Sequence, residues 1–423
     1  MNQAKPFPIT KLQVWEAYKR VKANKGGAGV DGQTLQAFEE DLGNNLYKLW
    51  NRMASGSYMP PPVRRVEIPK ANGGIRPLGI PTVVDRVSQM VVKQTLEPEL
   101  ERHFHPDSYG YRPGKSALDA VDITRTRCWR FDWVVEFDIK GLFDHIDHTL
   151  LLRALKKHVQ CEWAMLYIGR WLTAPLQHAD GTRVERTRGT PQGGVVSPVL
   201  ANLFLHYAFD VWMTRTYPDT PWCRYADDGL VHCRTEHEAQ AIKAALDVRL
   251  LQCGLQLHPD KTKIVYCKDG QRKGTYPNTQ FDFLGYTFRP RLVKNRKRNS
   301  MFVNFTPAVS KMALKSMRQT TRKLNFRNWT NLSLAEIARL HNPVLRGWLN
   351  YYQKYTPSAL NWFFHRLNER LVKWVRKTFK RFRTSEMKAL GWLQEAARGD
   401  PGLFAHWKGG HMPEAATRMR RAV

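Results

Sequence analysis

Two segments of the chain combine apolar, strand-forming residues with acidic side chains, and together they limit the folds that the sequence can adopt. WVVEFDI (133–139) is β-branched and aromatic and carries Asp138 near its end, and RYADDGLV (224–231) places Asp227 beside Asp228. A carboxylate at the end of a buried strand is unfavourable unless a cation or a hydrogen-bond donor meets it. We therefore expect two strands of one sheet to bring the three carboxylates together around positive charge.

The adjacent acids also have a simpler interpretation. Asp-Gly between two short strands is a common hairpin signal, and residues 222–225 and 229–233 have the composition of such strands around a tight turn. RYADDGLV alone favours an ordinary turn. The presence of Asp138 is what supports a functional site as an alternative interpretation. Either Lys and Arg side chains balance the carboxylates or a divalent metal does, and oxygen ligands without nearby His or Cys favour Mg²⁺. A pair of Mg²⁺ ions is typical of in-line phosphoryl transfer, which predicts a nucleotidyl transferase.

The charge balance indicates a polyanionic partner. The 423 residues include 67 Lys and Arg against 37 Asp and Glu, a formal net charge of +30, and 42% of them are hydrophobic. Such a chain is long enough for two or three domains, and its charge favours nucleic acid first and an anionic membrane surface second. Between Arg289 and Arg383 there are 23 Lys and Arg but only two acids, so we expect a domain boundary near residue 290.

Several other classes are disfavoured. The six cysteines have no zinc-ligand spacing and are expected to be reduced and mostly buried. The N-terminus MNQAKPFPIT lacks the apolar core of a signal peptide, and polar residues interrupt the most apolar stretch, 195–212. These observations predict a cytoplasmic protein that does not cross a membrane.

Hydrophobic patterns and turn residues predict mixed structure before residue 290. Helices are expected over 11–23, 33–53, 82–104 and 236–253, from Asp147 as an N-cap, and from Ser197 as an N-cap before Pro198. Strands are expected over 63–70, 133–139, 222–225, 229–233 and 281–288, and loops over 24–32, 71–74 and 189–198. Beyond residue 290 the pattern is helical, apart from 289–298, which is interpreted as a linker or an exposed hairpin.

Residues 357–381 form the clearest amphipathic helix of the chain. One stripe is apolar and comprises Leu360, Phe364, Leu367, Leu371 and Trp374. A second stripe is cationic and comprises Arg366, Arg370, Lys373, Lys377 and Lys380. A solvated polar face usually mixes charges, whereas Glu369 is the only acid here, so we expect the cationic stripe to bind nucleic acid. A solvated face is the alternative.

Several motifs resemble those of the reverse transcriptase/maturase proteins that group II introns encode, and they occur in the order typical of that family. They are RPLGIPTVVDRVSQ (76–89), SYGYRPGKSALDAV (108–121), FDIKGLFDHIDH (137–148), GTPQGGVVSPVLANLFL (189–205), YADD (225–228), GLQLHPDKTKIV (254–265), FDFLGYTF (281–288) and IARLHNPVLRGWLNYY (337–352). The resemblance implies an α+β right-hand polymerase with fingers, a palm built on an antiparallel sheet, and a helical thumb. Fingers and palm would occupy 1–290, with an N-terminal extension over 1–60, followed by a basic thumb or maturase domain over 291–385 and a short basic tail over 386–423.

The resemblance also implies roles for individual residues. Asp138, Asp227 and Asp228, with the backbone of Ile139, would bind two Mg²⁺ ions, with Mn²⁺ as an alternative ion. The incoming deoxynucleoside triphosphate would contact Lys70, Arg76, Phe143, Gln192 and Lys261. Lys70 and Arg76 are the cations that a triphosphate needs, although two solvated loop charges are the simpler interpretation. Lys261 would protonate the leaving pyrophosphate, and Lys263 competes for that role.

Phe143 lies five residues after Asp138, at the position that the family pattern places beneath the sugar of the nucleotide. A bulky ring there leaves no room for a 2′-hydroxyl and offers it no hydrogen bond, which favours deoxynucleotides and DNA synthesis. Spacing alone favours an ordinary core phenylalanine.

The implied function is an RNA-directed DNA polymerase that copies RNA into cDNA and binds intron RNA to assist splicing and mobility. Its expected partners are structured intron RNA, an RNA template with a DNA primer, and deoxynucleoside triphosphates, and both monomer and dimer are compatible with the sequence. The chain lacks the Cys and His/Asn cluster of the endonuclease that many family members carry, so we do not expect it to cut DNA. The alternatives are a maturase in which RNA binding dominates and a domesticated or phage-defence reverse transcriptase.

Overall fold

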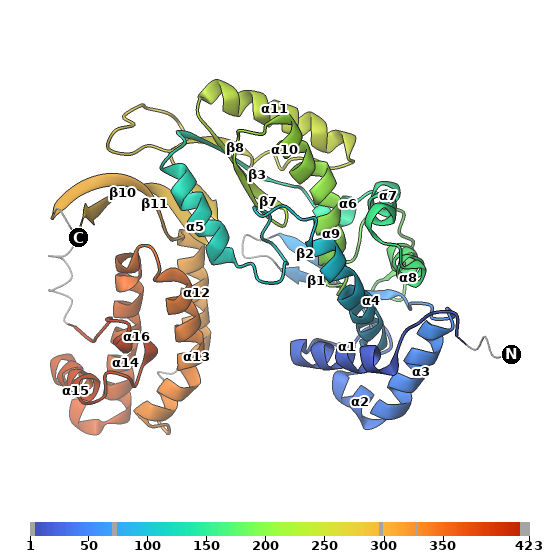
Figure 1. The fold of residues 1–423 in the computed structure, drawn as a ribbon. Helices are drawn as coiled ribbons and strands as arrows, with labels where there is room; N and C mark the ends of the chain where they lie inside the picture. The colour runs from blue at the N-terminus through green and yellow to red at the C-terminus, as the bar shows by residue number, and fades with distance from the viewer. Residues whose placement is uncertain (1–4, 70–73, 296–298, 326–327, 415–423) are drawn as a thin grey trace. The chain divides into compact units, whose positions relative to one another are not determined.

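A computed structural model describes residues 5–69, 74–295, 299–325 and 328–414 (Figure 1). Contacts divide the chain into two compact units, one formed by Met1–Ala120 and Trp133–Ile264, the other by Val121–Asp132 and Val265–Val423. The change in charge near residue 290 falls inside the second unit. No helix among the described residues is both long and apolar enough to cross a bilayer.

The helices of the described chain are α1 (Lys11–Asn24), α2 (Leu35–Glu40), α3 (Leu42–Ala54), α4 (Val83–Glu101), α5 (Ala117–Cys128), α6 (Leu142–His145), α7 (His148–His158), α8 (Glu162–Thr173), α9 (Ser197–Leu205), the π-helical η1 (His206–Asp210), α10 (Val211–Thr216), α11 (Glu236–Gln252), α12 (Lys311–Leu324), α13 (Leu334–Tyr352), the 3₁₀ turn η3 (Pro357–Leu360), α14 (Asn361–Thr378), the 3₁₀ turn η4 (Lys380–Phe382), α15 (Glu386–Gly399) and α16 (Ala405–Lys408). The strands are β1 (Val63–Pro69), β2 (Ile75–Ile80), β3 (Trp133–Asp138), β4 (Leu176–Gln177), β5 (Arg183–Val184), β6 (Trp222–Tyr225), β7 (Asp228–Cys233), β8 (Lys263–Tyr266), β9 (Phe281–Phe283), β10 (Tyr286–Asn295) and β11 (Ser300–Val309).

The N-terminal helices confirm one prediction and correct another. α1 begins within a residue or two of the prediction, with a capping box between Thr10 and Gln13. The single helix expected over 33–53 is divided into α2 and α3, because Asp41 between them leaves the helical region (φ −127°, ψ 47°). α1 and α3 both pack against α4.

The central sheet of the first unit has the strand order β6-β7-β3-β8. β3 pairs with β7 in antiparallel register from Trp133↔Cys233 to Asp138↔Asp228, so the two acidic segments do share a sheet. α11 packs on β3 and β7 (Figure 1). Val134, Val135 and Phe137 are fully buried or nearly so, which explains the continuous apolar run that precedes Asp138.

The tight turn between β6 and β7 is present, but Asp-Gly does not form it. Ala226 and Asp227 connect the strands, and Ala226 takes a left-handed backbone conformation (φ 56°). Gly229 lies inside β7, where a Cβ atom would come within 2.1 Å of the Phe137 ring. The glycine is therefore required by packing across the sheet, and the Asp-Gly interpretation of the turn is wrong.

Two further local predictions need correction. Ser197 does not cap α9, because the N-cap is Val196 and the Ser197 hydroxyl instead bonds the Thr190 hydroxyl at 2.8 Å. The strand expected over 281–288 is two strands, β9 and β10, joined by Leu284 and Gly285 in left-handed conformations (φ 51° and 78°). The cap of α7 is as predicted, since the Asp147 side chain accepts a hydrogen bond from the Leu150 N–H at 2.8 Å.

Within the second unit, the part of the chain that follows residue 264 begins with strands rather than helices. β10 and β11 pair from Tyr286↔Val309 to Asn295↔Ser300, so the helical prediction is wrong for 300–309 and the hairpin interpretation of 289–298 is right over its described part, 289–295. Farther on, the helix expected over 357–381 consists of η3, α14 and η4. Its apolar stripe is buried as predicted, in a core that includes Ile337 and Leu393. The cysteines are free, and all except the half-buried Cys161 are buried, as expected.

Candidate catalytic site

The strand register of the first unit brings the three predicted carboxylates to one end of the central sheet. Asp138 ends β3 directly opposite Asp228, which begins β7, and Asp227 precedes it in the turn. The Ile139 N–H donates to the backbone carbonyl of Asp227 at 3.3 Å, which ties the two segments together at this point. Asp138 is only 9% exposed and the other two acids are partly buried. Three carboxylates thus share a place with limited access to water.

Electrostatics at this place disfavour three full negative charges. Burial, followed by repulsion from Asp227 and Asp138, raises the pKa of Asp228 to about 7. Burial is also the main cause that raises the pKa of Asp227. The amino group of Lys261 forms an ion pair with Asp138. Although partial burial alone would lower it, the pKa of Lys261 is raised, because that pairing and the other two acids favour the charged amine.

The described residues contain no group of three or more His, Cys, Asp or Glu side chains positioned to hold a metal ion. Asp138 is paired with Lys261 instead, whereas Lys263 pairs with Glu136 at 3.1 Å. The donor set still has the chemistry of a magnesium site, because it consists of hard carboxylate oxygens, and burial followed by mutual repulsion raises the pKa of Asp228 to about 7. The three acids therefore fit Mg²⁺ in donor type and charge.

A buried ion pair supports the acidic hairpin. Arg224 of β6 donates to both carboxylate oxygens of Asp210, at 2.8 and 2.7 Å. The same guanidinium donates to the Ser108 hydroxyl at 2.8 Å, the Asn202 side chain at 3.2 Å and the Ala226 carbonyl at 3.1 Å. One arginine thus fixes the left-handed residue of the turn, and with it the position of Asp227.

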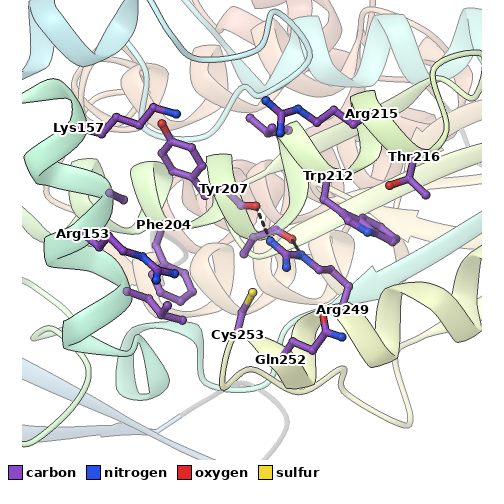
Figure 2. A pocket seen from close by; sticks show the side chains of 14 residues that line it. Arg153, Lys157, Phe204, Tyr207, Trp212, Arg215, Thr216, Arg249, Gln252 and Cys253 are labelled. Carbon is purple, nitrogen blue, oxygen red and sulfur yellow. Dashed lines mark hydrogen bonds between the residues drawn. The ribbon is translucent and has the colours of Figure 1, made fainter.

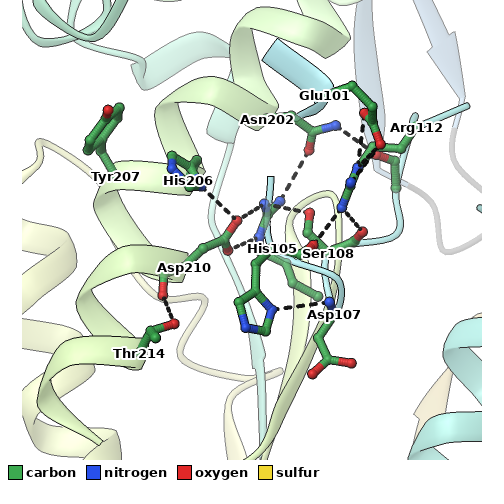
Figure 3. Close-up of polar contacts among 12 residues, drawn as sticks. Glu101, His105, Asp107, Ser108, Arg112, Asn202, His206, Tyr207, Asp210 and Thr214 are labelled. Atoms are coloured by element: carbon green, nitrogen blue, oxygen red, sulfur yellow. Dashed lines mark hydrogen bonds and ion pairs between the residues drawn. The ribbon is translucent and has the colours of Figure 1, made fainter. Parts of the chain in front are cut away.

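The segment before α5 supports the same hairpin. The Tyr109 N–H donates to the Arg224 carbonyl at 2.8 Å, and a Cβ atom on Gly110 would lie 2.4 Å from the Ala226 nitrogen. Arg112 holds this segment through Glu101 at 2.6 Å and through two backbone carbonyls (Figure 3). Gly110 is therefore needed for close approach, which explains the glycine within SYGYRP.

The π-helical segment η1 completes the support. It ends at Asp210, so the widened turn aims that carboxylate at Arg224. Arg249 of α11 donates to the carbonyls of Tyr207 and Ala208, at 2.9 and 3.1 Å. These bonds satisfy carbonyl groups inside the segment where the regular helical pattern is interrupted.

The predicted nucleotide loop is attached to the β1–β2 hairpin. Arg76 donates to the Gln192 side chain at 2.9 Å, and the Gly79 N–H donates to the Gln192 carbonyl at 2.7 Å. A Cβ atom on Gly193 would lie 2.5 Å from the Gly79 carbonyl oxygen, so the loop and the hairpin are in direct contact. Arg76 and Gln192 are therefore brought together as a pair. Lys70 lies outside the described residues.

A buried acid on α4 orders the other end of the same loop. The Gln89 side chain accepts from the N–H groups of Val195 and Val196, at 2.7 and 3.3 Å, while its amide donates to Asp85 at 2.9 Å. Asp85 also accepts from Tyr58 and from Trp171, at 2.8 and 2.7 Å. Asp85 thus positions the loop through Gln89, a role that the sequence did not suggest.

Phe143 lies beside this loop in α6. Its side chain is 7% exposed, and its carbonyl accepts from the Thr190 N–H at 2.7 Å. A cavity of about 300 Å³ is lined by Phe143, Gln192 and Arg186, among others. Tyr111, which sequence reasoning missed, packs its ring edge-on at 6.5 Å from the Phe143 ring and has a left-handed backbone (φ 57°). Such a conformation in a tyrosine is uncommon and concentrates at functional sites.

The predicted cations of α14 and η4 lie in the second unit, and three of them have partners there. Arg366 pairs with Glu369 at 2.7 Å, and Lys377 donates to Asn328 at 2.8 Å. Arg370 donates to the Thr321 carbonyl at 3.2 Å and is partly buried, Lys373 is exposed, and Lys380 is exposed in η4.

The structure adds two cations to this set. Arg318 and Arg322 of α12 line a cavity of about 400 Å³ together with Arg366, Arg370 and Lys373. Burial, then the neighbouring Arg322, lowers the pKa of Arg370, which is the effect expected of crowded positive charges. The basic spacing in KMALKSMRQTTRKL was the available signal for Arg318 and Arg322.

Comparison with known proteins identifies the family of the chain. The chain matches the reverse transcriptase (RNA-dependent DNA polymerase) family over residues 68–288 and the maturase-specific domain of group II introns over residues 314–391. Protein YkfC of Escherichia coli is 33% identical over 324 residues, which cover 67% of this chain and 81% of that protein. The group II intron-encoded protein LtrA of Lactococcus lactis subsp. cremoris is 36% identical over 194 residues, which cover 45% of this chain and 32% of that protein.

A further relative is an uncharacterized 91 kDa protein in the cob intron of Schizosaccharomyces pombe, 26% identical over 414 residues that cover 83% of this chain and 50% of that protein. The matched segments define the class of protein, a nucleic-acid polymerase whose template is RNA. The chain belongs to the reverse transcriptase family and carries a group II intron maturase-specific domain, which confirms the resemblance inferred from the motifs.

Proposed function

We propose that Asp138, Asp227 and Asp228, with the backbone carbonyl of Ile139, form the polymerising centre and bind two Mg²⁺ ions, with Mn²⁺ as an alternative ion. The observation that carries the proposal is the register that sets Asp138 opposite Asp228, where burial, followed by repulsion, raises the pKa of Asp228 to about 7. Acids that resist ionisation together favour a cation between them. When bound, such ions activate the primer 3′-hydroxyl and neutralise charge on the triphosphate.

The chain's own groups then bind and orient the deoxynucleoside triphosphate. Arg76 and Lys70 supply positive charge for the phosphates, and Gln192 holds the Arg76 guanidinium in place. The 3′-hydroxyl loses its proton to water as its oxygen bonds the α-phosphorus, and the bond from that phosphorus to the bridging oxygen of the leaving pyrophosphate breaks. Lys261 carries the proton that the departing pyrophosphate takes up, since its pKa is raised beside the three acids.

We further propose that the chain has right-hand polymerase architecture. Fingers and palm occupy 1–290, including an N-terminal extension over 1–60, and the thumb or maturase domain occupies 291–385. The segment expected as a tail, 386–423, instead contributes α15 and α16 to the core of the second unit. In the thumb, Arg366, Arg370, Lys373, Lys377 and Lys380, with Arg318 and Arg322, bind the backbone of structured intron RNA. The support is the crowding of cations around the α12–α14 cavity, where repulsion is relieved by a polyanion.

A maturase role in which RNA binding outweighs DNA synthesis is the second candidate. The observation that favours it is the excess of charge between Arg289 and Arg383, with 23 Lys and Arg and only two acids. An RNA-folding protein that grips many phosphates needs such a surface even without polymerisation.

The test separates the two roles. Asp227→Asn is compared with Asp219→Asn, which changes an exposed acid of the same unit. On an RNA template with a DNA primer we expect Asp227→Asn to lower extension more than about 100-fold, since even outer-shell changes at metal sites cost about 10–100-fold. Intron RNA binding is expected to be unchanged, and Mn²⁺ binding followed by electron paramagnetic resonance is expected to weaken. Full extension by Asp227→Asn would refute the assignment of the centre.

A further inference from the structure

The first unit contains a cavity that is separate from the acidic cluster and the nucleotide loop and has features of a second ligand site. Its volume is about 590 Å³, and α7, η1, α10 and α11 supply its walls (Figure 2). Volumes of about 300–1,000 Å³ are typical of pockets that enclose a small-molecule-sized group. None of the residues assigned to the polymerising centre lines this cavity, so the proposed polymerase does not account for it.

The charged side chains of the cavity are all cationic. Arg153 and Lys157 approach from α7 and Arg215 from α10, on the other side of the cavity (Figure 2). No acidic residue of the described chain lines it, and within the described residues Arg153 and Arg215 have neither an ion pair nor a hydrogen bond. Arg249 also lines it but is engaged with the carbonyls of η1. The three cations are exposed to solvent, and together they give the cavity a positive potential that attracts anions.

Aromatic side chains stand among these cations. Tyr207 and Trp212 line the cavity, and the amino group of Lys157 lies 5.2 Å from the centre of the Tyr207 ring. Trp212 is partly exposed and its other edge packs against Tyr217 at 5.6 Å. Flat rings beside cations are the combination that binds an unstacked base together with its phosphates. A simple anion would not need the rings, and an apolar ligand would not need the cations.

From these observations we propose that the cavity binds single-stranded RNA, with one unstacked base against Tyr207 or Trp212 and the flanking phosphates on Arg153, Lys157 and Arg215. This inference rests on the proposed function, because it names a second contact of the same RNA-binding protein. A continuous duplex cannot use the cavity, since its bases remain stacked inside the helix and only a loop, bulge or end can extend one. The partner is therefore an unpaired segment of RNA.

Binding of a labelled single-stranded oligoribonucleotide and of a blunt RNA duplex tests the proposal. Arg153→Ala/Arg215→Ala removes two cations of the cavity, and Lys48→Ala/Lys156→Ala removes two exposed cations that do not line it, one of them on α7 itself. For single strands, the slope of log affinity against log salt is expected to become shallower by about 1.4 in the cavity variant, at about 0.7 per lost phosphate contact. Duplex binding is expected to change no more than in the control.

A second measurement locates the base. Photocrosslinking of 4-thiouridine RNA, followed by peptide mapping, is expected to label the segment that contains Tyr207 and Trp212, and the cavity variant is expected to lose that label. Equal single-strand affinity in the cavity and control variants, or crosslinks that map elsewhere, would overturn the proposal. The proposal would also be overturned if the cavity variant bound RNA normally but no longer bound an acidic peptide. That result would assign the cavity to a protein partner.

Primer extension on a short template distinguishes the failure of this inference from failure of the proposed function. The cavity variant is expected to extend such a primer at the wild-type rate, because its substitutions lie outside the polymerising centre. If the wild type extends primers but the cavity variant binds single strands normally, the cavity inference alone fails. If the wild type extends no primer, the proposed function fails whichever result the cavity gives.

Discussion

Arg224 and Asp210 form a two-contact ion pair in which neither side chain is exposed to solvent. Asp210 ends the π-helical η1, and Arg224 also donates to the Ala226 carbonyl in the turn that carries Asp227. The pair therefore connects the packing of η1 to the position of Asp227, because one guanidinium bonds both Asp210 and the turn.

Replacing one member of the pair separates its effect on stability from its effect on activity. Asp210→Asn leaves the Arg224 charge buried without its counterion and is expected to lower the free energy of unfolding by about 3–5 kcal/mol, measured by urea denaturation. Asp210→Leu/Arg224→Met removes both charges and is expected to recover much of that loss. Because the double variant lacks the bond to the Ala226 carbonyl, primer extension is expected to stay low. Full extension by the double variant would show that the pair serves stability only.

The contact between Arg76 and Gln192 predicts a defect in nucleotide use rather than in folding. Both groups are near the surface, and Arg76 donates to Gln192 at 2.9 Å. Loss of a charged contact to the triphosphate is worth about 1.5–3 kcal/mol, so Arg76→Ala is expected to lower kcat/KM for deoxynucleotides by about 10–100-fold. Steady-state extension measures this effect. Arg64→Ala on the same hairpin is the control, and an equal loss there would point to the hairpin's overall charge.

Phe143 predicts discrimination between sugars. Phe143→Val shortens the side chain beside Gln192 and is expected to raise ribonucleotide incorporation relative to deoxynucleotide incorporation by about 10–200-fold, the range typical of steric selection. Single-nucleotide extension with each substrate gives the ratio. Tyr111→Phe keeps the neighbouring ring and is expected to leave the ratio unchanged. If Phe143→Val does not change the ratio of ribonucleotide to deoxynucleotide incorporation, Phe143 is a core residue with no role in sugar selection.

The sequence predicted the strands that carry the acids because those strands are buried and therefore almost uniformly apolar. It did not predict what supports them. In a chain of net charge +30, Arg224 is one of many cations. No local sequence pattern predicted its ion pair with Asp210, which lies fourteen residues away. Asp85 was hidden for the same reason, since its partners Tyr58 and Trp171 come from distant segments. Long-range polar networks depend on tertiary packing, which periodicity does not encode.

The errors at turns have a related cause. Asp-Gly placed the turn at 228–229, two positions after the observed 226–227, because the glycine is required by the Phe137 ring across the sheet rather than by the backbone of the turn. In FDFLGYTF, Leu284 takes a left-handed conformation that its side chain disfavours, so the sequence resembled one continuous strand. Both errors arise where contacts with other segments outweigh local preference.

The core of the second unit contains a histidine whose burial predicts pH-dependent stability. His406 has no exposed surface, donates to the Asn368 side chain at 2.8 Å and stacks on Phe364. Burial, and then the neighbouring His411, lowers the pKa of His406 to about 3. The unfolded chain takes up a proton near pH 6.5, whereas the folded chain does so only near pH 3, so stability is lost as pH falls through that window.

The expected loss is about 1.4 kcal/mol per pH unit below about 6.5, or about 2 kcal/mol between pH 6.5 and 5. Urea denaturation of the wild type at several pH values gives the slope. His406→Gln cannot titrate and still offers a donor to Asn368, so it is expected to be less stable at pH 8 but to have a shallower slope below pH 6.5. His237→Gln changes an exposed histidine and is the control. If His406→Gln keeps the wild-type slope, the acid sensitivity comes from other groups and the neutral, buried state of His406 contributes nothing to it.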